Sequence, residues 1–184
     1  MIPMPRVNRI LQHRNYEEFT EKNKQAEEKR VYCRHGSDHG LAVARIAYLY
    51  LLEKYIEDRG SLPGTGTNQA SIRLEESYGL GKESIYAAGI LHDIGRWIEY
   101  ENQEDHALAG ARLARPILRD CGFTEAEMEK IVLGISEHRL PPDQTSSILG
   151  QALALADDWA RDCQSCPSKA TCYKYTKAME DILI

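Results

Sequence analysis

Apolar side chains recur at three- and four-residue steps along most of the chain, and several of the resulting stripes include a histidine. Residues at this spacing share one face of an α-helix. The stripes are His39 with Val43, Ile46 and Tyr50; Ile85, Ala88 and Gly89 with His92; His106 with Gly110, Leu113 and Ile117; and Met128, Ile131 and Ile135 with His138. Each of these histidines is therefore predicted to point toward the protein core.

Two of the predicted helices begin at recognisable capping residues. Thr124 and Glu127 have the spacing of a capping box, in which each side chain bonds to the backbone of the other residue. Ser146 or Ser147 can cap a final helix that runs through Leu149. These two starts predict the last two helices of the bundle.

Other boundaries are predicted from single residues. Asn15 and Glu18 resemble a capping pair for a charged helix over residues 16–30. Gly95 is placed to end the helix that carries the second stripe, and Gly122 to end the helix that carries the third. The first of these two stops would put the second stripe's histidine at a helix C-terminus.

The segment from Arg59 to Ala70, RGSLPGTGTNQA, has glycines and a proline but no periodicity, and it is expected to form a surface loop of about a dozen residues. No segment shows the alternation that is typical of a strand. A chain of 184 residues can bury one sizeable core. The sequence therefore predicts an all-α, single-domain protein.

Composition and charge exclude two classes of partner. No apolar run approaches the roughly 18 residues of a membrane span, and the start, MIPMPR, lacks the apolar core of a signal peptide. The net charge of −5 argues against a broad face for a nucleic acid polymer, which needs clustered Lys and Arg. We therefore expect a cytoplasmic protein whose partner is small and whose oligomeric state the sequence leaves open.

The histidine stripes are joined by carboxylates at Asp93 and Asp157, both in apolar surroundings. A buried carboxylate needs a cation or hydrogen-bond partners. Imidazole and carboxylate together are the ligand set of Fe, Mn, Zn or Co, and six such ligands exceed what one tetrahedral zinc ion requires. The surplus favours two divalent transition metal ions.

The order of these residues resembles the HD superfamily of metal-dependent phosphohydrolases. His39, the pair His92-Asp93 in LHDIG, and Asp157 in LADDWAR stand at that family's positions, and the resemblance runs from about residue 31 to 161. It implies an HD-type helical bundle over residues 31–161, with an N-terminal helical extension at 1–30. A Cys-rich C-terminal tail at 162–184 is expected to pack on the same domain.

Two further positions are similar to a subset of the family that holds a second metal ion. They are His106 in HALAGA and His138 in SEHR, and the HALAGA segment resembles bacterial hydrolases of dinucleoside tetraphosphates. The residues after His138, Arg139 to Pro142, lack the Gly-Tyr-Pro signature of cyclic-dinucleotide phosphodiesterases. Dinucleoside tetraphosphate is therefore one candidate among nucleotide-like substrates.

The resemblance implies hydrolysis of a phosphoester or phosphoanhydride in a small, nucleotide-like substrate through a metal-activated hydroxide. Asp93 would bridge the two ions. One ion would be held by His39, His92 and Asp157, and the other by His106 and His138. Two alternatives keep the same ligands: a diiron oxygenase of the HD type, and a non-catalytic sensor of a nucleotide or metal.

Several residues near these motifs are candidates for supporting roles. Arg96 follows HDIG directly and is expected to bind a substrate phosphate, because a guanidinium can form two parallel bonds to phosphate oxygens. Lys82 and Arg139 are weaker candidates for the same role. The remaining expectations are that His35 and Asp38 face the ligands or the substrate, and that Arg45 and Arg161 serve structure.

The tail carries Cys163, Cys166 and Cys172 in a C-x2-C-x5-C arrangement that could hold a second metal cluster. Three thiolates leave a zinc ion or an iron–sulfur cluster one ligand short. Cys33 or Cys121 could complete the set if the fold brings one of them to the tail. Reduced structural thiols are the alternative.

Overall fold

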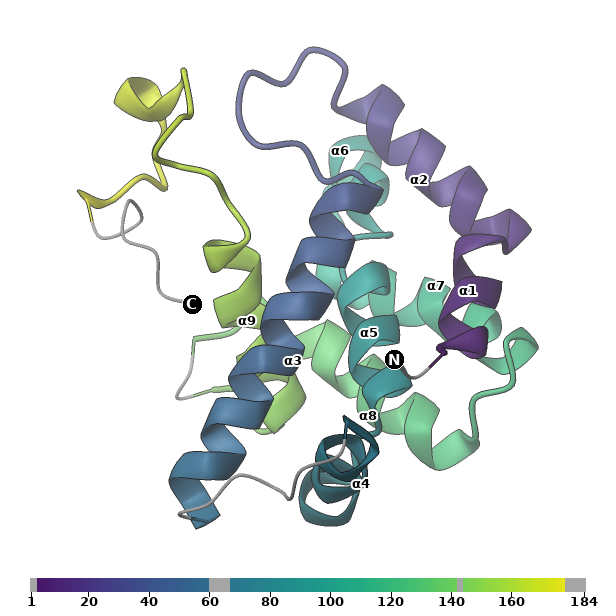
Figure 1. The fold of residues 1–184 in the computed structure, drawn as a ribbon. Coiled ribbons are helices and arrows are strands. Elements are labelled where there is room, and N and C mark those ends of the chain that lie inside the picture. Colours follow the sequence, from purple (N-terminus) through teal and green to yellow (C-terminus); the bar gives the residue numbers. More distant parts are fainter. Residues whose placement is uncertain (1–2, 60–66, 142–143, 178–184) are drawn as a thin grey trace.

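The computed structural model describes residues 3–59, 67–141 and 144–177, and within these ranges the chain forms helices and no strands (Figure 1). The elements are α1 (Pro5–Leu11), α2 (Arg14–Ala26), α3 (Ser37–Arg59), α4 (Thr67–Tyr78), α5 (Lys82–Leu91), α6 (Arg96–Asn102), α7 (His106–Asp120), α8 (Glu125–Glu137), α9 (Ile148–Trp159) and a 3-10 turn at Lys169–Thr171. The predicted all-α class is confirmed.

Helix α5 forms the centre of the bundle, because all its residues from Ser84 to Leu91 are buried. It packs against α3 along most of its length. A Cβ atom at Gly89 would lie 2.5 Å from Cα of Ala44, so only glycine permits this close approach. The contact places the start of α3 beside the end of α5.

The other helices surround this pair (Figure 1). Helix α9 packs on α3, α8 packs on both α9 and α5, and α7 packs on α8. Short helix α6 joins α5 to α7, and α2 lies against it. Within the described ranges, no helix combines the length and the hydropathy needed to cross a membrane.

The capping predictions for the last two helices are confirmed. Thr124 and Glu127 form both bonds of the capping box at the start of α8. The Ser147 hydroxyl accepts the N–H of Gly150 at the start of α9. Gly122 has a φ of +87°, a left-handed conformation that stops α7 as predicted.

Three boundary predictions are wrong. The cap of α2 is His13, whose ring nitrogen accepts the N–H of Asn15 in the place of an Asn side chain. The loop predicted from Arg59 to Ala70 is too long, because α4 already begins at Thr67; residues 60–66 lie outside the described part. Gly95 is the N-cap of α6 and does not end α5, which stops at Leu91; the predicted position of His92 at a helix C-terminus is nevertheless confirmed, because His92 is the C-cap of α5.

Candidate metal centre

The predicted metal ligands all lie at or near helix ends that meet in the middle of the bundle. They are His39 on α3, His92 and Asp93 directly after α5, His106 at the start of α7, His138 directly after α8, and Asp157 near the end of α9. Local sequence sets these positions. Asp105, for example, caps α7 by accepting the N–H groups of Ala107 and Leu108.

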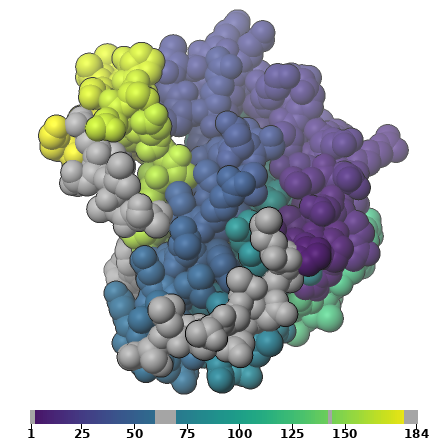
Figure 2. Space-filling model, viewed as in Figure 1, coloured from purple at the N-terminus to yellow at the C-terminus, as the bar shows by residue number. Residues whose placement is uncertain are grey.

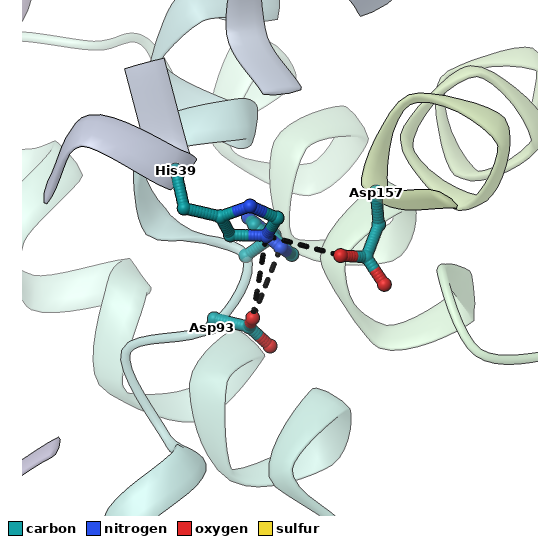
Figure 3. Close-up of side chains that lie close together, drawn as sticks. His39, Asp93 and Asp157 are labelled. Atoms are coloured by element: carbon teal, nitrogen blue, oxygen red, sulfur yellow. Dashed lines mark hydrogen bonds and ion pairs between the residues drawn. The ribbon is translucent and has the colours of Figure 1, made fainter. Parts of the chain in front are cut away.

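Four of these residues form a first group of potential ligands, His39, His92, Asp93 and Asp157, whose ligand atoms lie within 4.8 Å of one another. His39 Nε2 lies 3.0 Å from Asp157 Oδ1 and 4.0 Å from Asp93 Oδ2. Figure 3 shows the His39 ring between the two carboxylates. His92 Nε2 lies 3.2 Å from the same Oδ2 atom of Asp93.

A second group consists of Asp93, His106 and His138. The Nε2 atoms of the two histidines lie 3.0 and 3.8 Å from Oδ1 of Asp93. One oxygen of this carboxylate therefore faces the first group and the other faces the second. This is the arrangement of a carboxylate that bridges two metal ions.

The histidine rings are oriented by backbone carbonyls. Nδ1 of His92 lies 2.7 Å from the carbonyl oxygen of Gly89, and Nδ1 of His138 lies 2.7 Å from that of Ile135. Because each Nδ1 donates its proton, each Nε2 is left with a lone pair directed at the site. His92 Nε2 is buried and has no hydrogen-bond partner in the described part of the chain. These residues fit a divalent transition metal ion.

Opposing charges shift the pKa values of the cluster. Burial raises the pKa of Asp93, but the charge of His92 and the hydrogen bond with His106 outweigh burial and hold this pKa well below its usual range. Burial lowers the pKa of His92, but Asp93 raises it to about 9. Burial, aided by the other histidines, lowers the pKa of His138 to about 4. Without a cation, His92 therefore carries a proton that balances the carboxylates, and a bound cation would replace that proton at Nε2.

A buried pair behind Asp93 joins the α2–α3 connection to the site. Nδ1 of His35 lies 2.6 Å from Glu27 Oε1, and its backbone N–H donates to Glu27 Oε2 at 2.8 Å. His35 Nε2 lies 3.9 Å from Asp93 Oδ2, so His35 faces the ligands as predicted. Glu27 was missed because it closes a Lys/Glu run that reads as a solvated face, yet it is 2% exposed.

Glu99 on α6 is a second residue that sequence reasoning missed. Its Oε2 atom lies 2.5 Å from Nδ1 of His106, and its Oε1 accepts a hydrogen bond from Arg139 at 2.9 Å. Glu99 therefore orients His106 in the way that the backbone carbonyls orient the other rings. Glu99 precedes His106 by seven residues, and this spacing was the available sequence signal. The two side chains meet only because residues Arg96–Asn102 form a short helix before α7 begins.

The predicted arginines take different places around the centre. Nη1 of Arg96 lies 3.0 Å from His106 Nε2, and its Nε lies 3.7 Å from Glu27 Oε1. Arg161 bonds to Asp157 Oδ2 at 2.6 Å and leaves Oδ1 facing His39, which agrees with the structural role expected of it. Arg45 is exposed on α3.

Two of the weaker candidates do not reach the site. Lys82 begins α5 whereas His92 follows its end, a separation of roughly 15 Å at 1.5 Å per residue, and its ammonium lies over the rings of Tyr48 and Tyr86. A phosphate-binding role for Lys82 is therefore wrong. Asp38 is exposed in the first turn of α3 and belongs to neither ligand group nor the pocket lining.

A pocket of about 540 Å³ opens onto the centre. His106, His138 and Asp157 form part of its wall. The remaining lining combines cationic and aromatic side chains, among them Arg30, Arg96, Arg139, Arg161, Tyr32, Tyr50 and Tyr173. The ligands therefore face a space that suits an anionic molecule with a flat ring.

The cysteines of the tail are all free thiols. Cys163 is buried, whereas Cys166 and Cys172 are partly exposed. Among the described residues, the groups of potential ligands within 4.8 Å of one another contain no cysteine. A metal site in the tail stays a prediction at this point.

Comparisons with known proteins agree with this geometry. The HD domain family matches residues 36–162. An uncharacterized protein of Clostridium beijerinckii is 36% identical over 169 residues, 92% of each chain. Ribonuclease Y of Mycoplasma mycoides is 33% identical over 79 residues, 43% of this chain and 17% of the relative. A bifunctional uridylyltransferase/uridylyl-removing enzyme of Ruegeria pomeroyi is 34% identical over 65 residues, 35% of this chain and 7% of the relative. No solved structure matches the chain.

Proposed function

The chain belongs to the HD domain family, and from this premise we propose that it is a metal-dependent phosphohydrolase acting on a small nucleotide-like phosphoester or phosphoanhydride. The observation that carries the proposal is the placement of Asp93. Its two carboxylate oxygens face two separate groups of imidazole nitrogens. A site that only binds a nucleotide has no need of such a bridge.

Two divalent cations at this centre would supply positive charge that stabilises the transition state of phosphoryl transfer and lowers the pKa of water. His39, His92 and Asp157 would hold one cation, and His106 and His138 the other, with Asp93 shared between them. Glu99 and the backbone carbonyls of Gly89 and Ile135 fix the ring orientations. The protein's contribution is thus a preformed set of ligands.

Cationic side chains at the pocket would bind the phosphates of the substrate. The Arg96 side chain is 15% exposed, lines the pocket and contacts the His106 ring. Arg139 reaches the same rim while bonded to Glu99 and Asp105. Because a guanidinium forms paired bonds to phosphate oxygens, these residues would orient the phosphoryl group toward the centre.

His35 is placed to move a proton during the reaction. Its Nδ1 is held by Glu27, and its Nε2 faces both Asp93 and the pocket. An imidazole whose Nδ1 proton is held by a carboxylate can accept a proton at Nε2 from an attacking water. Burial lowers the pKa of His35 despite the opposing effect of Glu27, so the ring is neutral near pH 7 and its Nε2 is free to accept that proton.

A nucleotide suits the pocket for two reasons. Its volume of about 540 Å³ lies within the range of small-molecule sites. Tyr50 and Tyr173 offer aromatic faces beside the arginines, which match a base next to phosphates. The names of the relatives, a ribonuclease and a uridylyl-removing enzyme, also refer to nucleotide chemistry.

The decisive experiment combines metal analysis with a substrate screen. The full chain would be purified without oxygen, loaded with Fe, Mn, Co or Zn, and offered nucleoside phosphates and dinucleoside polyphosphates under anaerobic conditions. We expect phosphate release, and we expect Asp93→Ala to lose metal and at least about 100-fold of the activity, because the cations would face each other without the shared carboxylate.

Asp120→Ala is the matched control, because Asp120 is 63% exposed at the end of α7 and belongs to neither ligand group nor the pocket lining. It should keep both metal and activity. Full activity in metal-loaded Asp93→Ala would contradict the mechanism. Turnover that requires oxygen would instead assign the centre to an oxygenase, and nucleotide binding without turnover would assign it to a sensor.

A further inference from the structure

The segment after α9 lies beside the connection between α2 and α3, although these segments are far apart in the sequence. The Ser168 hydroxyl donates to the carbonyl oxygen of Val31 at 2.7 Å, and the Tyr32 hydroxyl donates to that of Thr171 at 3.1 Å. Figures 1 and 2 show the tail against this connection. These hydrogen bonds are made by residues next to Cys33 in the connection and by residues between Cys166 and Cys172 in the tail.

Four thiols consequently share one neighbourhood. Burial raises the pKa of Cys163, and nearby Cys33, Cys166 and Cys172 raise it further, while Arg161 opposes them. The geometry agrees, because Cys33, Cys163 and Cys172 line one pocket and backbone turns join Cys166 to Cys172 through Lys169. The fifth thiol, Cys121, is 1% exposed in the helical core and interacts instead with Arg9 and Asp120.

The tail has regular turns but almost no apolar core. Backbone hydrogen bonds join Cys166 to Lys169 and Lys169 to Cys172, so a 3-10 turn separates the two cysteines. Of residues 161–177, only Cys163 is buried. A segment that buries so little apolar surface gains little from the hydrophobic effect, and small segments of this kind are often held by a metal.

The spacing of the sulfur atoms distinguishes between two occupants. Thiolates bound to one zinc ion at about 2.3 Å lie roughly 4 Å from one another. In the described part of the chain, no three cysteine sulfurs lie within 4.8 Å of one another. The cysteines of an iron–sulfur cluster bind different iron atoms and therefore stand farther apart. Thiols that share one pocket wall but form no such tight group among the described residues match a cluster better than a single zinc ion.

We propose that Cys33, Cys163, Cys166 and Cys172 are the ligands of an iron–sulfur cluster that is separate from the His/Asp centre. Cys33, Cys163 and Cys172 also line the pocket that opens onto that centre. The cluster would therefore fix the tail as one wall of the pocket, including Tyr173. This inference does not depend on the proposed hydrolase activity.

Acid-labile sulfide is the measurement that separates the two centres, because a His/Asp site binds iron without sulfide. The full chain would be purified without oxygen, reconstituted with a mixture of ferrous and ferric iron and with sulfide, and desalted. We expect bound sulfide together with iron, and visible absorption of iron–sulfur charge transfer that bleaches on reduction. Protein that retains no sulfide after reconstitution would overturn the proposal.

Substitutions test the four ligands individually. Cys33→Ser and Cys166→Ser should lose most of the sulfide and the visible absorption but keep metal at the His/Asp centre. Cys121→Ser is the matched control and should keep the cluster. Full sulfide in Cys33→Ser would overturn this ligand set, and one zinc ion per chain without sulfide would overturn the iron–sulfur assignment. If a variant fails to fold, Mössbauer spectra of the wild-type chain still decide whether the iron belongs to a cluster.

Discussion

Arg96 connects the candidate metal centre to the pocket through one guanidinium. Its Nη1 atom contacts His106, and its Nε faces Glu27 at 3.7 Å. Burial lowers its pKa, but Asp93 and other nearby acidic groups raise it above the usual value, so the side chain stays charged. A permanent charge at this point can serve a phosphate group as well as the surrounding carboxylates.

We predict that Arg96→Ala lowers kcat/KM by about tenfold or more, which corresponds to roughly 1.4 kcal/mol of lost interaction with the phosphate. Arg96→Lys should recover only part of the loss, because an ammonium keeps the charge but cannot form two parallel hydrogen bonds to a phosphate. Steady-state kinetics would measure both effects, and metal content should stay near the wild-type value.

Arg112→Ala is the control for this prediction, because Arg112 is a surface arginine of α7 with a 60% exposed side chain. It should leave kinetics unchanged. An Arg96→Ala variant with wild-type kinetics and a clearly lowered melting temperature would show that Arg96 supports the helix end instead.

At the scale of elements, the connection between α8 and α9 depends on one buried carboxylate. Glu137 accepts the backbone N–H groups of Ser146 and Ser147 at 3.2 and 2.9 Å, and it also accepts both hydroxyls. Burial alone would raise the pKa of Glu137, but these hydrogen bonds lower it. They fix the start of α9, and so the position of Asp157.

We predict that Glu137→Ala destabilises the protein by about 2–3 kcal/mol, because several donors lose a charged acceptor. The melting temperature at neutral pH should fall by roughly 5–10 °C for a chain of this size. Glu129→Ala on the exposed face of α8 is the control and should change it little.

The stabilisation that Glu137 contributes depends on pH in a defined direction. Since the folded pKa of Glu137 lies below its unfolded value of 4.5, its contribution is present above that value and is lost as the pH falls through the folded pKa. The difference between variant and wild type should therefore shrink in acid. A difference that grows in acid would contradict the role of the charged carboxylate.

At the scale of the whole molecule, cation binding is coupled to the packing of the bundle, because α3, α5, α7, α8 and α9 or the residues directly after them supply the ligands. A ligand that binds only the folded state stabilises it. At 100 to 1,000 times its Kd, a cation would contribute about 3–4 kcal/mol.

We therefore predict that chelation lowers the melting temperature by roughly 10 °C, given the usual shift for a chain of this length. Scanning calorimetry with and without a chelator would measure this shift. Asp93→Ala should already melt near the chelated wild type and respond little to the chelator. Equal melting temperatures of loaded and chelated wild type would contradict binding at the shared centre.

The sequence alone determined the features that depend on neighbouring residues. The capping box at Thr124 and Glu127, the Ser147 cap and the left-handed stop at Gly122 follow from side chains that reach their own backbone. Helical spacing also predicted that the candidate ligands point inward. The resemblance to the HD superfamily then supplied their order, and the match over residues 36–162 confirms the family.

Only the tertiary structure decided which distant residues meet. Glu27 reads as solvated in its charged run but is buried against His35, and Lys82 shares the helix before His92 but lies at its opposite end. Cys33 lies beside the tail because its neighbours Val31 and Tyr32 form hydrogen bonds with Ser168 and Thr171 of the tail. Helical periodicity determines on which side of its own helix a residue lies. These contacts depend instead on how different helices and loops pack against one another, and the local sequence pattern holds no information about that packing.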